Sequence, residues 1–275
     1  ASNAHACENN TSSRRGIGGR LVTMTPADIL TALDLPTSSR VDQRVPKKML
    51  LENGALTAAD KHIINDGIEE LFWLAALKPT TIGVPEYRDD VREYLEIAVL
   101  RLTLRAAARA TRLVELVHRA VPYPLLLLTE QGERPGLSAA HKRWSQGEAG
   151  KTVLEGEVVA VEWDAERDGE RWPVFRDALA LGKQPRTTLH ALYQGWIDTL
   201  LALHTARVTG AFAVAANAEQ TAVRLDALQE CARLDREIAR LRATAAKEKQ
   251  MARRVELNLE LKRVEAAQAA ARANL

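Results

Sequence analysis

The last quarter of the chain, residues 211–275, contains neither glycine nor proline. It is rich in Ala, Leu, Glu, Lys and Arg, the residues with the highest helix propensities. Because glycine and proline are the residues that most readily end a helix, we expect one continuous helix here. At a rise of 1.5 Å per residue, about sixty residues of helix extend roughly 90 Å, well beyond a globular body of this size.

Apolar residues recur in this segment at alternating spacings of four and three, as in a coiled-coil seam. The seam passes through Ala227, Cys231, Leu234, Ile238, Leu241, Ala245, Glu248, Ala252, Val255, Leu259 and Lys262. A rod cannot bury this seam on its own domain, so a second copy, another protein or its own second half must cover it. We expect a homodimer; the alternative is a hairpin that folds back at residues 247–250, where polar residues interrupt the seam. The expected interaction residues are Leu234, Ile238, Leu241, Val255 and Leu259.

Residues 24–208 alternate between helical and strand patterns and predict a separate globular domain. Thr25 before Pro26 is typical of a helix start, and the four leucines after Pro124 predict a buried strand fed by a helix. Strands are expected within 70–77, 91–105, 123–131, 136–144 and 155–163, and the longer helices within 107–121 and 187–208.

These patterns predict an α+β fold with three parts. Residues 24–208 form a mixed sheet of about five strands with helices mainly on one side, and residues 209–275 form a helical coiled-coil arm. Residues 1–23 have no apolar stretch of the kind a secretory signal needs, so we expect a disordered leader.

Charge, cysteine spacing and the length of apolar runs argue against several classes of protein. The chain has 38 Lys and Arg against 36 Asp and Glu, so it has no overall field that would attract nucleic acid or anionic lipid. Cys7 and Cys231 lie far apart and lack the spacing of a disulfide framework or a zinc site. The longest apolar run near Leu125 is too short to span a bilayer. We expect a cytoplasmic protein without a cofactor.

No catalytic motif fits its sequence context. The segment SQGEAGKT at residues 145–152 resembles a phosphate-binding loop, but a strand pattern follows it where such a loop requires a helix. A metal-dependent nuclease would need carboxylates and a lysine on adjacent strands, for which Glu96, Glu130 and Lys142 are weak candidates. The six histidines show no ligand spacing. The sequence therefore favours a protein without an active site, with a nuclease or other DNA-processing enzyme as the alternative.

Local charge gives a further alternative, a DNA-binding module. Residues 224–272 contain 12 Lys and Arg and 8 Asp and Glu, and Arg253 and Arg254 are candidates for contact with the DNA backbone. Mixed charges beside an apolar seam are also typical of any solvated coiled coil.

Several segments in combination resemble the bacterial domain-of-unknown-function family 4391. They include AVPYPLLLL at 120–128, AHKRW at 140–144 and KEKQMARRVELNLELKRVE at 247–265, and the resemblance covers about residues 45–264. Members of that family look like companions of restriction-type DNA methyltransferases and helicases in bacterial defence clusters. The resemblance thus implies a non-catalytic accessory or scaffold protein of a restriction or phage-defence system, with a helicase or methyltransferase as a possible partner. It carries over no catalytic residue.

Overall fold

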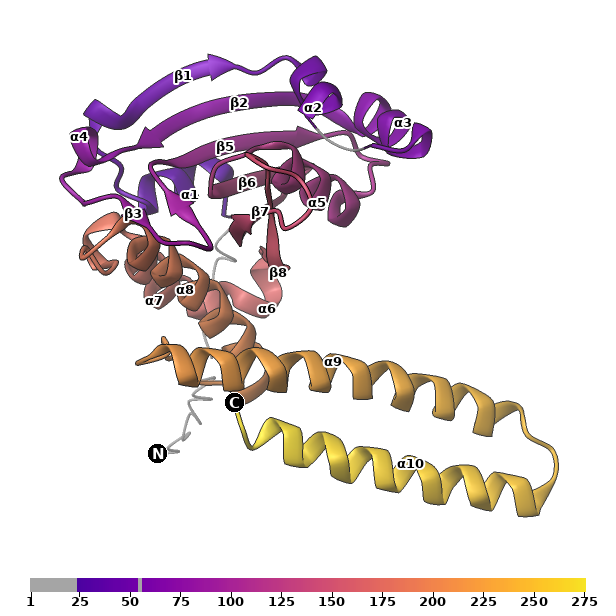
Figure 1. The fold of residues 1–275 in the computed structure, drawn as a ribbon. Helices are drawn as coiled ribbons and strands as arrows, with labels where there is room; N and C mark the ends of the chain where they lie inside the picture. The colour runs from indigo at the N-terminus through magenta and orange to yellow at the C-terminus, as the bar shows by residue number, and fades with distance from the viewer. Residues whose placement is uncertain (1–23, 54–55) are drawn as a thin grey trace, which may run out of the picture.

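The structure, a computed structural model, describes residues 24–53 and 56–275, so the expected leader at residues 1–23 lies outside the described part. A six-stranded mixed sheet forms the centre of the body, in the order β1-β2-β5-β6-β7-β8 (Figure 1). Its strands are β1 (Arg40–Arg44), β2 (Ile68–Leu77), β5 (Ile97–Leu104), β6 (Leu125–Gln131), β7 (Arg134–Trp144) and β8 (Thr152–Glu162). Only β5 and β6 run parallel, joined by the crossover helix α5 (Ala110–Ala120), and the other neighbours are antiparallel.

Helices cover both faces of the sheet, which corrects the expectation that they lie mainly on one side. One face packs against α1 (Pro26–Ala32), α7 (Trp172–Leu179) and α8 (Leu189–Thr209), and the other against α2 (Lys47–Asn53), α3 (Ala58–Gly67) and α5. The reason is visible in β5, where Ile97 and Val99 join the first core while Ala98 and Leu100 join the second. A strand that is apolar on both faces needs a helix layer on each.

The local signals at element ends behave as the sequence predicts. Thr25 and Thr57 form capping boxes with Asp28 and Asp60 at the starts of α1 and α3. The four leucines of β6 are buried, directly after α5 and the Pro124 entry, which confirms the helix-to-strand prediction. Residues 145–151 connect β7 to β8 as a turn, so the phosphate-loop interpretation is excluded by the strand that follows.

Short elements complete the body. A small second sheet pairs β3 (Tyr87–Arg88) with β4 (Glu93–Tyr94), and two further one-turn helices are α4 (Pro79–Ile82) and α6 (Ala165–Asp168). No helix in residues 24–53 and 56–275 combines the length and apolarity that crossing a membrane requires.

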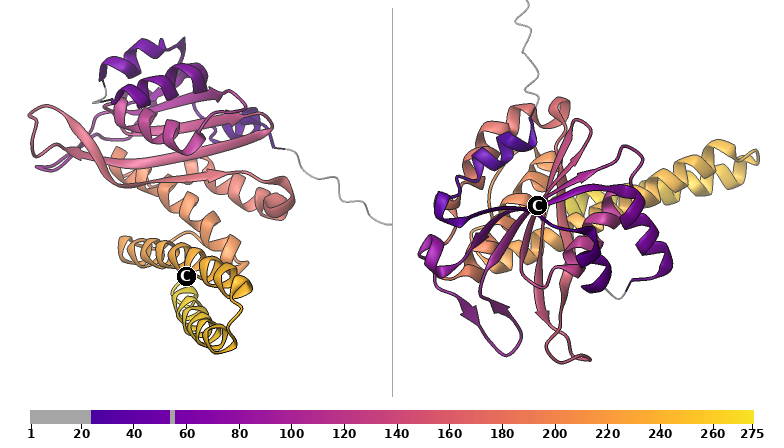
Figure 2. Two further views of the ribbon diagram at one scale, coloured as in Figure 1. Left: turned by 90° about the vertical axis from the view of Figure 1, so that its right-hand side faces the viewer. Right: turned by 90° about the horizontal axis from the view of Figure 1, so that it is seen from above.

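The C-terminal region forms two helices, α9 (Ala218–Lys247) and α10 (Met251–Arg272), so the single continuous helix is wrong. They fold into a hairpin, here called the arm, that projects from the body (Figures 1 and 2). The break falls at residues 248–250, where Glu248 adopts an extended conformation after α9. A helix can therefore end without glycine or proline when a polar interruption lets two apolar faces pack against each other.

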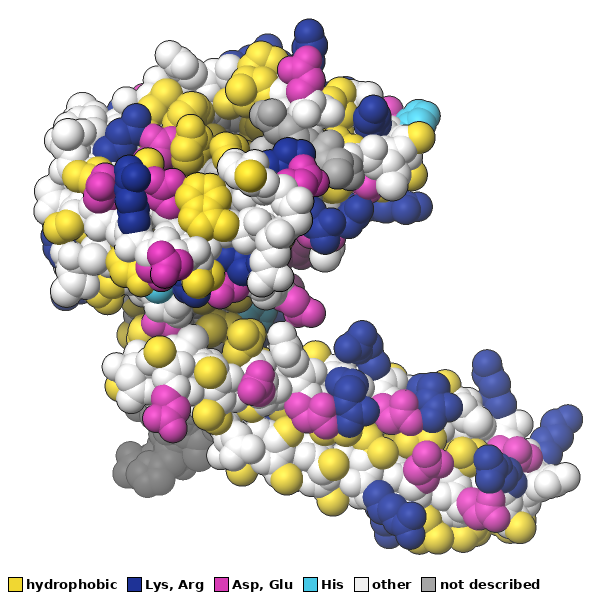
Figure 3. All heavy atoms as spheres, in the orientation of Figure 1, with side chains coloured by type: hydrophobic (Ala, Val, Ile, Leu, Met, Phe, Trp, Pro, Cys, Tyr) yellow, Lys and Arg dark blue, Asp and Glu magenta, His cyan; other side chains and the backbone are white. Residues whose placement is uncertain are grey.

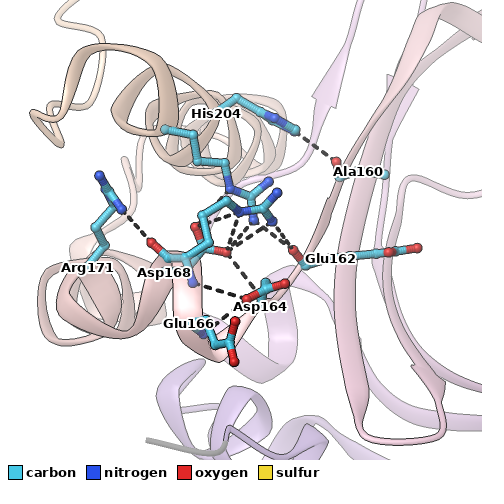
Figure 4. Close-up of polar contacts among 9 residues, drawn as sticks. Ala160, Glu162, Asp164, Glu166, Asp168, Arg171 and His204 are labelled. Carbon is cyan, nitrogen blue, oxygen red and sulfur yellow. Dashed lines mark hydrogen bonds and ion pairs between the residues drawn. The ribbon is translucent and has the colours of Figure 1, made fainter. Parts of the chain in front are cut away.

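A buried ion pair fastens the end of α8 to the body. Asp168 is fully buried and accepts hydrogen bonds from Arg207 on α8 at 3.0 and 2.7 Å, and from Arg167 (Figure 4). Arg207 also donates to the carbonyl of Glu162, and His204 to that of Ala160, so α8 covers part of the free edge of β8. The helix that leads into the arm is thereby fixed against β8 and α6.

We predict that Asp168→Asn destabilises the fold by about 3–5 kcal/mol, because it leaves the mostly buried Arg207 guanidinium without its counter-charge. Chemical denaturation at pH 7 measures this. Burial alone would raise the pKa of Asp168, but the hydrogen bonds from Arg207 and Arg167 hold it below its usual value. The stabilisation is therefore present above the unfolded-state pKa and is lost as the pH falls through the lowered one.

The matched control is Asp177→Asn, which removes an exposed carboxylate paired with Arg176. Exposed pairs contribute less than about 1 kcal/mol, so this variant should unfold almost as the parent does. Equal effects of the two substitutions would contradict the anchoring role of Asp168.

Candidate functional site

The inner seam of the arm is formed by one face of each helix. On α9, Cys231, Leu234, Ile238 and Leu241 are buried. On α10, the residues that turn inward are Leu257, Val264 and Ala271. Arg242 of α9 forms an ion pair of 2.7 Å with Glu265 of α10, and Gln268 donates to Asp235. The folded-back hairpin, the alternative interpretation of the sequence, is therefore the arrangement found within the chain.

The second half of the expected seam lies elsewhere. Val255 and Leu259 are 50% and 55% exposed on the outer face of α10, so they do not share an interface with Leu234, Ile238 and Leu241. The expected single seam is wrong because the break at 248–250 resets the helical phase. The apolar residues before the break close the hairpin, whereas the next members of the same heptad pattern point away from it.

The end of the arm, residues 242–254 and here called the tip, comprises the break and the adjoining ends of α9 and α10, and it is strongly basic. It contains the five basic residues Arg242, Lys247, Lys249, Arg253 and Arg254, and one acidic residue, Glu248. The rest of the 224–272 segment then has seven basic and seven acidic residues, so the tip accounts for the whole excess of positive charge.

Ion pairs occur both along the helices and at the tip, where Arg242 pairs with Glu265. Glu230 pairs with Arg233 and Glu237 with Arg240, both along α9 at 2.7 and 2.6 Å. At the tip, Arg253 contacts Glu256, but within the described part of the chain Lys247, Lys249 and Arg254 form no ion pair. The space-filling view shows the alternating charges of α9 and the basic side chains at the far end (Figure 3).

A chain of hydrogen bonds connects the base of the arm to the sheet. Thr221 of α9 donates to Asp198 of α8 at 2.8 Å, and Gln194 donates to the same oxygen at 2.9 Å. The Gln194 carbonyl oxygen lies 2.7 Å from Nε2 of His141 on β7, and the other ring nitrogen of His141 contacts the hydroxyl of Tyr94. The position of α9 is thus linked to a polar cluster inside the body.

This cluster, here called the imidazole cluster, contains His141, His190, Tyr87, Tyr94 and Arg92. The two imidazole rings stack with centroids 5.0 Å apart, and Tyr87 and Tyr94 each lie 4.9 Å from His190. Arg92 approaches Nε2 of His190 at 3.3 Å. Burial, with the nearby His141 and Arg92, lowers the pKa of His190 to about 4, and burial lowers that of His141. Both rings are therefore neutral at pH 7.

Residues far apart in the sequence meet in this cluster, which explains why sequence patterns did not reveal it. His141 and His190 lie on different elements, and their spacing fits no local ligand motif. The alternation of β7 does place His141 on the opposite face from Lys142, toward α8. No group of three or more His, Cys, Asp or Glu side chains in the described ranges is arranged to hold a metal ion.

On the opposite face, a groove of about 810 Å³ lies between α5 and the outer strands. Ser138 is part of its lining and lies 2.9 Å from Nε2 of the fully buried His118. Burial and the neighbouring Lys142 charge lower the pKa of His118 to about 3, so it is neutral. Among the residues that the structure describes, its Nδ1 has no partner that would orient the ring as a base, so this pair is best described as a polar contact between α5 and β7.

The three weak catalytic candidates do not converge. Glu96 precedes β5 and pairs with Lys78 at 3.0 Å, whereas Glu130 lies near the far end of the parallel β6. Lys142 is buried, which lowers its pKa to about 7, and its ammonium donates to the carbonyls of His118 and Val121 at the end of α5. Its contacts are those of a helix C-terminal cap, and the three side chains form no common cleft.

We predict that stability falls as the pH decreases from about 6.5 to 4, because the unfolded chain then binds protons that the folded imidazole cluster excludes. His190→Gln should reduce the number of protons taken up on unfolding, and with it the slope of stability against pH, by up to about one proton. Part of the slope should remain, because His118 and His141 also have lowered pKa values. Urea denaturation at a series of pH values measures the free energy of unfolding and therefore this slope. An identical slope in the parent and in His190→Gln would contradict the prediction.

Comparison with known proteins gives one match. No curated protein and no solved structure shows significant similarity to the chain. The sequence matches the family described as Domain of unknown function (DUF4391) over residues 33–267, which includes the sheet, α8 and nearly all of the arm. The chain belongs to this family.

Proposed function

We propose that this protein is a non-catalytic accessory subunit of a bacterial DNA-restriction or phage-defence system, and that the tip of its arm contacts nucleic acid. The observation that carries the proposal is the concentration of the arm's excess positive charge in residues 242–254. Charge that is merely needed for solubility would be spread along both helices. Here residues 224–241 and 255–272 are balanced, and the excess lies at the end of the arm far from the body (Figure 1).

The chemistry of the tip suits phosphate. Lys247, Lys249 and Arg254 have no carboxylate partner in the described part of the chain, so they can exchange water and counterions for phosphate oxygens at little cost. Long side chains around a turn present donors in several directions, which supports contact with a backbone and gives little base discrimination. We therefore expect binding that depends strongly on salt and weakly on sequence.

The separation of the catalytic candidates supports an accessory role. Glu96 lies before the start of β5 and Glu130 near the end of the neighbouring parallel strand β6, so the two carboxylates are at opposite ends of these strands. The ammonium of Lys142 donates to backbone carbonyls. A helicase or DNA methyltransferase is the partner we propose to supply the chemistry, and the family resemblance favours both. Glu96- or Lys142-dependent nicking of plasmid DNA with magnesium or manganese would instead support the nuclease alternative.

We predict that replacing Lys249, Arg253 and Arg254 together by Gln weakens binding to duplex DNA at least tenfold at low salt. Each lost phosphate contact reduces the slope of log affinity against log salt by about 0.9, so three contacts reduce it by about 2.7. Fluorescence anisotropy over a salt series measures both the affinity and the slope.

The matched control replaces Arg233, Arg236 and Arg240 by Gln, which removes the same charge from the exposed side of α9. This variant should keep most of the parent's affinity and its salt slope. Equal losses in the two triple variants would show a response to net charge alone. If the parent chain fails to bind duplex or single-stranded DNA at low salt, the proposed nucleic-acid contact is wrong.

A further inference from the structure

The outer face of α10 is apolar along its length. Met251, Val255 and Leu259 are 66%, 50% and 55% exposed, and small residues continue the same face. Its members are Met251, Ala252, Val255, Leu259, Ala266, Ala269 and Ala273, interrupted by Lys262. At 100° per residue they lie opposite Leu257, Val264 and Ala271, which pack on α9. Apolar side chains follow this edge of the arm in the space-filling view (Figure 3).

We propose that this face pairs with the same face of α10 in a second copy of the chain, antiparallel and around a two-fold axis. Alternating spacings of three and four put Ala252, Leu259, Ala266 and Ala273 at one core position of a heptad, and Val255, Lys262 and Ala269 at the other. The two hairpins would then form a four-helix assembly, with the inner seams already closed within each chain.

Charges that flank the face specify both direction and register. Glu256 and Arg263 are one heptad apart on the same border of the face. In an antiparallel pair, equivalent borders meet, so Glu256 can face the partner's Arg263 twice around the axis. This register also sets Val255 against the partner's Ala266 and Ala252 against the partner's Ala269, and it overlaps nearly the whole of both helices.

Other arrangements lose this complementarity. A shift by one heptad in either direction places Glu256 against its own copy or Arg263 against its own copy, and like charges at such positions are repulsive. A parallel pair sets Glu256 beside Met251 and Arg263 beside Asn258, with no ion pair. The face is therefore complementary to itself in one antiparallel register, which favours a second copy over an unrelated partner.

Lys262 fits this arrangement. It lies against the partner's Leu259 near the axis, where its four-carbon stem can cover the leucine while the ammonium reaches water at the border. A lysine at a single core position weakens a helical pair but fixes its register. Lys262→Leu should accordingly tighten the dimer.

Charge reversal tests the pairing. In sedimentation velocity over a concentration series, Glu256→Arg and Arg263→Glu should each raise the dimer dissociation constant about tenfold or more, and the double variant should restore it. Glu237→Arg, a reversal on α9, should leave the dissociation constant within about twofold of the parent's. A parent chain that sediments as a monomer at all concentrations, or a double variant weaker than both single variants, would overturn the proposal.

Disulfide cross-linking tests the register independently of affinity. In a background with Cys7→Ser and Cys231→Ala, the pair Val255→Cys and Ala266→Cys should give covalent dimers on mild oxidation. These positions are eleven residues apart on one helix, about 16 Å, so they cannot bridge within a chain. Val255→Cys alone should remain monomeric on a denaturing gel. Efficient cross-linking by Val255→Cys alone would show a parallel pair and overturn the antiparallel register.

Discussion

The packing of α8 against the sheet is the interaction on which the rest of the structure depends. Tyr193 is fully buried, and its hydroxyl donates to the backbone carbonyl of Leu125 or Ala140 and accepts from the amide of Ala140, which joins α8 to β6 and β7. Trp196 donates to the carbonyl of Leu179 at 2.9 Å and thereby holds α7. Because Thr221 of α9 donates a hydrogen bond to Asp198 of α8, the same helix also holds the base of the arm.

Polar side chains on α8 fix its orientation against the sheet as well as stabilising the fold. Gln194 and Asp198 connect the imidazole cluster to Thr221, while His204 and Arg207 occupy carbonyls at the edge of β8. Each contact is directional, so together they fix the rotation of α8 about its axis, which apolar packing alone specifies weakly. Covering the edge carbonyls also reduces the tendency of β8 to pair with another strand.

Much of the fold follows from local sequence, and the remainder depends on contacts between distant residues. Strand and helix patterns predict β2, β5, β6, β7, β8, α5 and α8, because their apolar periodicity is strong. The edge strand β1 has the sequence RVDQR, which is mostly exposed and carries no strand pattern. The apolar residues on both faces of β5 are the signal in the sequence for helices on both sides of the sheet. The meeting of His141 and His190 depends on sheet register, which no local pattern encodes.

The arm shows how one heptad pattern can specify two interfaces. The residues before the break close the hairpin within the chain, and those after it remain exposed on α10. In the antiparallel register, residue 250 of each chain is level with residue 271 of its partner, so the two basic tips are separated along the helices by about 32 Å. That spacing is close to the roughly 34 Å repeat of duplex DNA. Two tips could then reach the backbone one helical turn apart, so weak phosphate contacts on separate copies would act together on one duplex.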